Sequence, residues 1–139
     1  MRVVLDTNIF ISGIFFGGIP RKVLNLIQEK QIIPCFIPTT FSELEHLLWH
    51  KKFLKQRNLL SFSINEFLEK LQNYSLIFPQ AAKIPKVIKQ DAADNHFLAC
   101  ALLSQACFIV SGDKHLLKLK EFQGIPVLTA GQLLKHLNK

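Results

Sequence analysis

Two short apolar segments run directly into aspartate-containing turns, and this feature constrains the fold more than any other. Arg2–Leu5 is followed at once by Asp6, and Phe108–Val110 leads into Ser111 and Asp113. Continuous apolar runs of this length are typical of strands covered on both faces, as in a parallel sheet. Because the carboxyl ends of parallel strands share one edge, we expect Asp6 and Asp113 to lie on the same edge.

Helical patterns separate the other apolar segments, which predicts an α/β fold. Further strands are expected at residues 32–37, 75–78 and 126–128, with right-handed crossovers between them. The run from Thr40 to Glu43 has the form of a capping box, and Thr129 is expected to cap a final helix. The predicted architecture is a three-layer α/β/α sandwich with a mostly parallel, about five-stranded sheet, in one domain spanning residues 1–139.

Composition favours a compact protein with acidic partners. Apolar residues make up 49% of the chain, which argues against disorder. The formal net charge is +7, which places nucleic acid first among the expected partners. A soluble basic protein with no such partner is the plainer interpretation. The odd number of cysteines without a CxxC pair favours reduced core thiols. No apolar run approaches membrane-spanning length, so we expect a cytoplasmic protein without membrane contact.

Carboxylates are predicted to gather at one site. Asp6 and Asp113 follow buried strands, Asp91 and Asp94 open the helix that feeds the second of them, and Glu43 opens a helix after another strand. Crowded like charges raise one another's pKa values, and a divalent cation removes that penalty. Oxygen ligands without a Cys/His cluster favour Mg²⁺ or Mn²⁺. Such an ion activates water and stabilises charge on a phosphoryl group.

The acids other than Asp6 also have a structural interpretation, whereas Asp6, at a strand end before Thr7 and Asn8, has no obvious packing reason. Glu43 is suited to be the partner residue of a capping box, Asp91 or Asp94 to be a helix N-cap, and Asp113 to cap the short helix after it. The same choice applies to the basic residues, which are either a solvated face or phosphate contacts. The candidates for contact with nucleic acid are Lys51, Lys52, Lys55, Arg57 and Lys114.

Four stretches together resemble the PIN-domain family of small metal-dependent ribonucleases, which includes the VapC-type toxins. They read VVLDTNIFIS, SELEHLL followed by KF, DAADNHFLACA and FIVSGDKHLLKL, and they occur in the order of that family. The resemblance implies a parallel α/β/α sandwich whose acids hold Mg²⁺ or Mn²⁺, and it suggests a homodimer. The acids that it implies, in catalysis and metal binding, are Asp6, Glu43, Asp94 and Asp113.

The resemblance also assigns supporting residues. Asp91 matches an additional acid of the branch of toxins that this chain most resembles, and Asn8 and Ser111 match polar residues that brace the acids. One departure stands out: His115 occupies a position where that branch usually has a second acid. An auxiliary ligand or hydrogen bond at position 115 is therefore in doubt, whereas the four main acids are intact.

Three functions compete at this point. The first is an endoribonuclease that cleaves single-stranded or structured RNA, as the toxin of a toxin–antitoxin pair neutralised by a small antitoxin. The second is an aspartyl-phosphate phosphatase, which needs a second Asp two residues after the first. Asn8 occupies that position and argues against it. The third is a non-catalytic RNA-binding or assembly module in which the acids serve only as caps.

Overall fold

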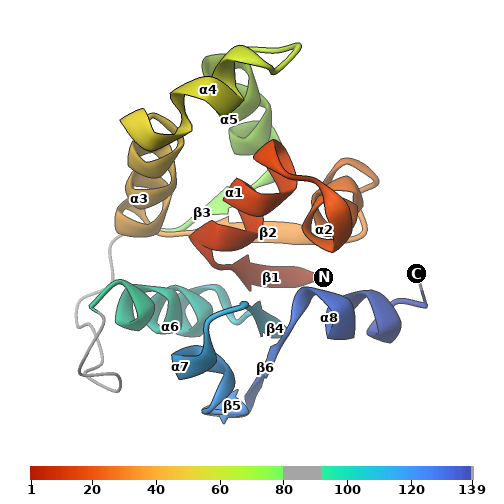
Figure 1. Cartoon of the computed structure of the whole chain (residues 1–139). Helices are drawn as coiled ribbons and strands as arrows, with labels where there is room; N and C mark the ends of the chain where they lie inside the picture. Colours follow the sequence, from red (N-terminus) through yellow and green to blue (C-terminus); the bar gives the residue numbers. More distant parts are fainter. Residues whose placement is uncertain (80–91, 139) are drawn as a thin grey trace.

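A computed structural model describes residues 1–79 and 92–138, with the side chains of residues 92–94 excepted. Its described part contains one sheet with strand order β3-β2-β1-β4-β6-β5 (Figure 1). Neighbouring strands are parallel except for β5, which runs antiparallel to β6. The strands are β1 Arg2–Leu5, β2 Ile33–Phe36, β3 Leu76–Ile77, β4 Phe108–Val110, β5 Glu121–Phe122 and β6 Ile125–Leu128.

Helices follow most of the strands along the chain. They are α1 Thr7–Phe15, α2 Gly18–Gln28, α3 Pro38–Leu48, α4 Leu54–Asn58, α5 Ile64–Tyr74, α6 Ala92–Ser104, α7 Lys114–Leu117 and α8 Ala130–His136, with a 3-10 turn η1 at Lys51–Phe53. Figure 1 shows α1, α2 and α3 on one side of β1 and α6 on the other. This arrangement confirms the predicted α/β/α sandwich.

Alternating side chains of the strands divide the core between the two faces. Val3 and Leu5 of β1 pack with residues of α1, α2, α3, α5 and α8, whereas Val4 packs with α6 and α7. Ile109 and Val110 of β4 divide in the same way. All five side chains are almost fully buried, as expected for central strands of a sheet covered on both faces.

The strand order reverses at β1. From β1 the chain moves outward through β2 to β3, and then returns to the other side of β1 to build β4, β6 and β5. The carboxyl ends of β1 and β4 therefore flank a topological switch point, the place where ligands bind in open α/β sheets. Asp6 continues directly from β1 there, and its backbone N–H donates to the Val110 carbonyl at 3.0 Å.

Three sequence-based expectations need correction. The sheet has six strands within the described residues rather than about five, because the two-residue β5 pairs with β6. Helix α3 begins at Pro38, so Thr40 is not its N-cap; the Thr40 hydroxyl instead accepts from the Ile37 N–H at 3.0 Å. Cys107 is exposed, whereas Cys35 and Cys100 are buried free thiols as expected.

Within the described residues, no single helix is both long enough and apolar enough to cross a membrane. Helices α1 and α2 reach the length and apolar composition of a membrane span only when they are taken together, and they are bent by 101° relative to each other. Ile9, Phe10 and Ile14 of α1 and Val23 and Leu26 of α2 lie in the core.

Candidate metal and active site at the carboxyl edge of the sheet

Ser111 links two of the predicted acids. Its hydroxyl donates a short hydrogen bond to Oδ2 of Asp6 and accepts one from the backbone N–H of Asp113 at 2.9 Å. Ser111 is fully buried, and its own N–H donates to the Leu128 carbonyl of β6 at 2.9 Å. The turn after β4 is thereby fixed against the end of β1. We call Asp6, Ser111 and Asp113 the acidic edge.

Asp6 is a buried carboxylate with only 4% of its surface exposed. Burial raises its pKa, while hydrogen bonds from the Ser111 hydroxyl and from backbone amides act in the opposite direction. One of these amides is that of Ile9, which donates to Oδ1 at 3.2 Å and makes Asp6 the N-cap of α1. The cap explains the orientation of the side chain, but the cost of desolvating its charge remains.

Asp113 caps a helix with its carboxylate and contacts Ser111 through its backbone N–H. Its Oδ1 accepts from the His115 N–H at 2.7 Å, which starts α7. The expected capping role is therefore present. His115 stands where the toxins that this chain resembles usually have a second acid, but its contact with Asp113 is made by its backbone N–H. Any residue other than proline supplies that N–H, so this contact does not depend on the side chain at position 115.

Glu43 lies in the second turn of α3, not in the first. Since α3 begins at Pro38, position 43 is too far along the helix to be the N3 residue of a capping box, and that structural interpretation of Glu43 is wrong. Its side chain is half-buried and makes at least one interaction with its surroundings. Helix α3 packs against both α1 and α6, the helices that follow Asp6 and carry Asp94.

The remaining acids belong to the start of α6. Asp94 is the third residue of α6, in its first turn, and its side chain lies outside the described set. Asp91 lies outside the described residues altogether. Among the side chains that are described, no three His, Cys, Asp or Glu residues are placed to hold a metal ion together. The structure thus joins Asp6 to Asp113 but does not complete a metal site with Glu43.

Two features of this edge were not predicted from the sequence. The Thr7 hydroxyl is buried beside Asp6 and has no hydrogen-bond partner among the described residues. Thr39 in the first turn of α3 forms a 3.0 Å hydrogen bond with Nδ1 of His96, in the first turn and a half of α6. Thr7 directly follows Asp6, so the sequence itself points to its position. The Thr39–His96 contact joins residues 57 positions apart and has no local sequence signal.

Several of the other predicted residues, which support the acids or carry positive charge, are exposed. Asn8 has an exposed side chain, and only its backbone amide contributes to lowering the Asp6 pKa. Lys114 is exposed at the first position of α7, directly after Asp113. Lys51, Lys52 and Lys55 are exposed on η1 and α4, beyond the far end of α3. In the acidic edge, Asp6 and Ser111 are thus buried and Asp113 is half-buried, whereas these four lysines are exposed.

Comparisons with known proteins agree with this architecture. An uncharacterized protein of Methanocaldococcus jannaschii is 31% identical over 125 residues, which cover 87% of this chain and 76% of that protein. The crystal structure of VapBC2 from Rickettsia felis bound to a DNA fragment from their promoter has a similar fold, with a TM-score of 0.61. The match is 16% identical and covers 93% of this chain and 98% of that chain. The family model of the PIN domain matches residues 2–115. The chain therefore belongs to the PIN-domain family.

Proposed function

We propose that the protein is a metal-dependent endoribonuclease that hydrolyses phosphodiester bonds of RNA and acts as the toxin of a toxin–antitoxin pair. The observation that carries the proposal is the acidic edge, where Asp6 and Asp113 meet through Ser111 at the switch point of the sheet. PIN domains are typically nucleases, which supports the hydrolytic part of the proposal.

The residues present are suited to a hard divalent cation. Asp6 carries a charge that burial disfavours, and the nearby Thr7 hydroxyl lacks a partner among the described residues. Both features are expected of a place where a bound ion would compensate for lost water. We propose that Asp6, Asp94 and Asp113 hold Mg²⁺ or Mn²⁺, with Glu43 acting directly or through water. When bound, the ion would supply an activated water and stabilise negative charge on the phosphoryl group.

The chain's own contribution is to orient the carboxylates before substrate arrives. Asp6 accepts hydrogen bonds on both oxygens, from the Ile9 N–H at Oδ1 and from the Ser111 hydroxyl at Oδ2. Together these bonds fix the plane of the carboxylate. Ser111 fixes the turn that carries Asp113 in the same way. Preorganised ligands of this kind lower the cost of binding an ion.

The partners follow from the same proposal. The net charge of +7 favours a polyanionic substrate, which RNA provides. The fold is similar to that of VapBC2, which supports a small antitoxin as protein partner. A homodimer is part of the proposal as well. It rests on the family to which the chain belongs rather than on a contact between copies.

The decisive test compares the parent protein with Asp6→Asn. We expect Asp6→Asn to abolish Mg²⁺- or Mn²⁺-dependent cleavage of a mixed RNA pool, a loss of about a thousandfold or more, while circular dichroism shows a folded protein. Glu45→Gln is the matched control, because Glu45 is an exposed acid on α3 two residues from Glu43. Equal cleavage by the parent and Asp6→Asn would show that Asp6 has no part in the reaction.

Thermal unfolding separates the nuclease from a non-catalytic module. A cation that binds only the folded protein stabilises it by about 2.7 kcal/mol at a hundred times its Kd. Mn²⁺ should therefore raise the Tm of the parent and of Glu45→Gln, but not that of Asp6→Asn. If Mn²⁺ shifts none of the three, the acids serve only as caps and the module without catalysis is the better description.

A further inference from the structure

Trp49 is an exposed aromatic residue at the far end of α3. It is the only tryptophan in the chain, and 48% of its surface is accessible. It occupies the C-cap position, where its backbone N–H donates to the Glu45 carbonyl, so the ring itself is not needed to end the helix. A large apolar side chain that remains half-exposed in this position is available for a ligand.

Arg57 holds this ring in place. Its guanidinium carbon lies 5.4 Å from the centre of the Trp49 ring, within the range of a cation–π contact. Its Nη1 donates to the Leu48 and His50 carbonyls, both at 2.8 Å, and the Leu48 carbonyl is one of those at the end of α3 that have no partner within the helix. The guanidinium is therefore tied to the backbone on both sides of Trp49. The indole rests on a fixed support and loses little freedom when a second flat group binds.

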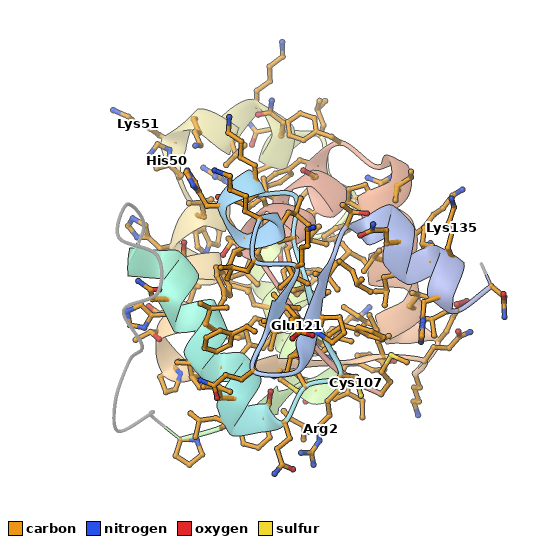
Figure 2. All side chains as sticks on the ribbon, turned by 90° about the horizontal axis from the view of Figure 1, so that it is seen from below. Arg2, His50, Lys51, Cys107, Glu121 and Lys135 are labelled. Atoms are coloured by element: carbon orange, nitrogen blue, oxygen red, sulfur yellow. The ribbon has the colours of Figure 1, made fainter. Side chains whose placement is uncertain are left out.

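Several basic residues follow Trp49 in the sequence. Residues 50–65 contain three lysines, one arginine and one histidine but no aspartate or glutamate. Lys51 and Lys55 are exposed, and Lys52 lies with its Nζ 5.2 Å from the centre of the Phe53 ring. Figure 2 shows His50 and Lys51 projecting outward. We call Trp49, His50, Lys51, Lys52, Lys55 and Arg57 the Trp49 patch.

The Trp49 patch and Glu43 lie along one helix. Trp49 is the C-cap of α3, six positions after Glu43, which corresponds to a rotation of about 120° around the helix axis and about 9 Å along it. At the stacked spacing of about 3.4 Å per nucleotide in one strand, this distance is roughly three nucleotides. An RNA strand that runs from Glu43 to the ring must therefore follow the surface of α3 over at least about three nucleotides.

We propose that Trp49, supported by Arg57, is a stacking site for an unpaired base of single-stranded RNA, with Lys51 and Lys55 contacting the adjacent phosphates. The proposal rests on the nuclease function proposed above and adds to it a base-binding residue separate from the acids. An aromatic face beside a run of lysines is how proteins hold single strands without reading their sequence. A paired base is buried in its own duplex stack, so the site favours unpaired segments.

The single tryptophan provides a direct test of stacking. Fluorescence of the intact protein is followed in EDTA, so that no cleavage occurs, while a short single-stranded RNA is added. We expect the RNA to quench Trp49 emission, and an abasic oligomer with the same number of phosphates to leave it nearly unchanged. Equal quenching by both oligomers would mean that charge alone brings the strand to this surface, and would overturn the proposal. Quenching by a poly-glutamate peptide as strong as that by RNA would overturn it as well, in favour of an acidic protein partner.

Variants separate this site from the catalytic acids. In EDTA, Trp49→Ala should weaken binding of labelled single-stranded RNA about tenfold, the usual effect of losing one stacked base, and Trp49→Phe should restore part of it. Phe62→Ala, at another exposed aromatic residue, should bind like the parent. With metal present, Trp49→Ala should raise KM and leave kcat unchanged. Unchanged RNA affinity in a folded Trp49→Ala protein would overturn the stacking site and leave the nuclease assignment intact. Equal cleavage by the parent and Asp6→Asn would instead count against the nuclease assignment and leave the stacking site intact.

Discussion

The acidic edge and the Trp49 patch are both polar, but they are built in opposite ways. In the acidic edge, Asp6 and Ser111 are buried and each is bound to a group far away in the sequence. In the Trp49 patch, the lysines are exposed and the contacts of Arg57 stay within ten residues of it. The first arrangement suits groups that must keep a fixed geometry, and the second suits groups that meet a flexible strand.

This contrast determines how substitutions should act. Removing one group from a buried, satisfied network leaves its partners without hydrogen bonds, which costs more than the bond itself contributed. Removing one exposed charge changes little because water and salt compensate for it. Effects at the acidic edge should therefore be large and should act on catalysis, whereas effects at the Trp49 patch should be smaller and should act on binding.

Ser111→Ala should give the largest effect among the supporting residues. It removes the donor to Asp6 and leaves the Asp113 N–H without its acceptor. We expect metal affinity or cleavage to fall by about 10- to 100-fold, as for other residues that orient metal ligands, and folding to lose about 1–3 kcal/mol. Metal titration by calorimetry and urea unfolding measure the two effects separately.

The matched control for Ser111→Ala is Ser104→Ala. Ser104 is equally buried, but its hydroxyl contacts the Ala101 carbonyl one turn earlier in α6, away from the acids. Ser104→Ala should change stability and leave metal affinity unchanged. If both variants lost metal affinity to the same degree, the loss would reflect general destabilisation rather than the link between Asp6 and Asp113.

A smaller effect is expected in the pH dependence of stability without metal. Burial raises the pKa of Asp6 above its value of 3.8 in an unfolded chain. Folding therefore favours the protonated form, and the contribution of Asp6 is fully present below 3.8 and is lost as the pH rises through the higher folded pKa. In EDTA, Asp6→Asn should gain stability relative to the parent between acidic and neutral pH. Urea unfolding of both proteins at an acidic pH and at neutral pH measures this gain. A stability difference between the two proteins that is the same at both pH values would contradict a desolvated Asp6.

The smallest effect should come from single lysines of the Trp49 patch. Lys51→Ala removes one exposed charge, so RNA affinity should fall slightly and the dependence of log affinity on log salt should become shallower by about one unit. Lys135→Ala is the control, because Lys135 lies on α8, on the opposite side of the molecule from Lys51 in Figure 2. Equal slopes for the two variants would mean that RNA does not contact Lys51.

Much of the sheet was predictable because buried strands have a strong sequence signal. The apolar runs at β1 and β4 gave both their burial and the shared edge of Asp6 and Asp113. Strand β5 gave no such signal, since it has only two residues. It joins β6 through Gln123 and Gly124, whose φ angles of 48° and 84° form the two-residue turn that usually contains Asn-Gly.

The start of α3 was missed for a different reason. The strand predicted at residues 32–37 ends just before Pro38, and proline also suits the first turn of a helix, where its missing N–H costs nothing. Moving the start to Pro38 changes Glu43 from a capping residue into a residue of the second turn. The support of Trp49 by Arg57 could not be predicted either, because it depends on how α4 folds back onto the end of α3.

The hydrogen bond between Asp6 and Ser111 joins residues 105 positions apart. During synthesis, β1 leaves the ribosome long before β4 exists, so an unfinished chain has Asp6 without the strand and the hydroxyl that complete its surroundings. Products that stop before β4 lack this edge entirely. The proposed nuclease activity therefore requires that most of the polypeptide has been translated.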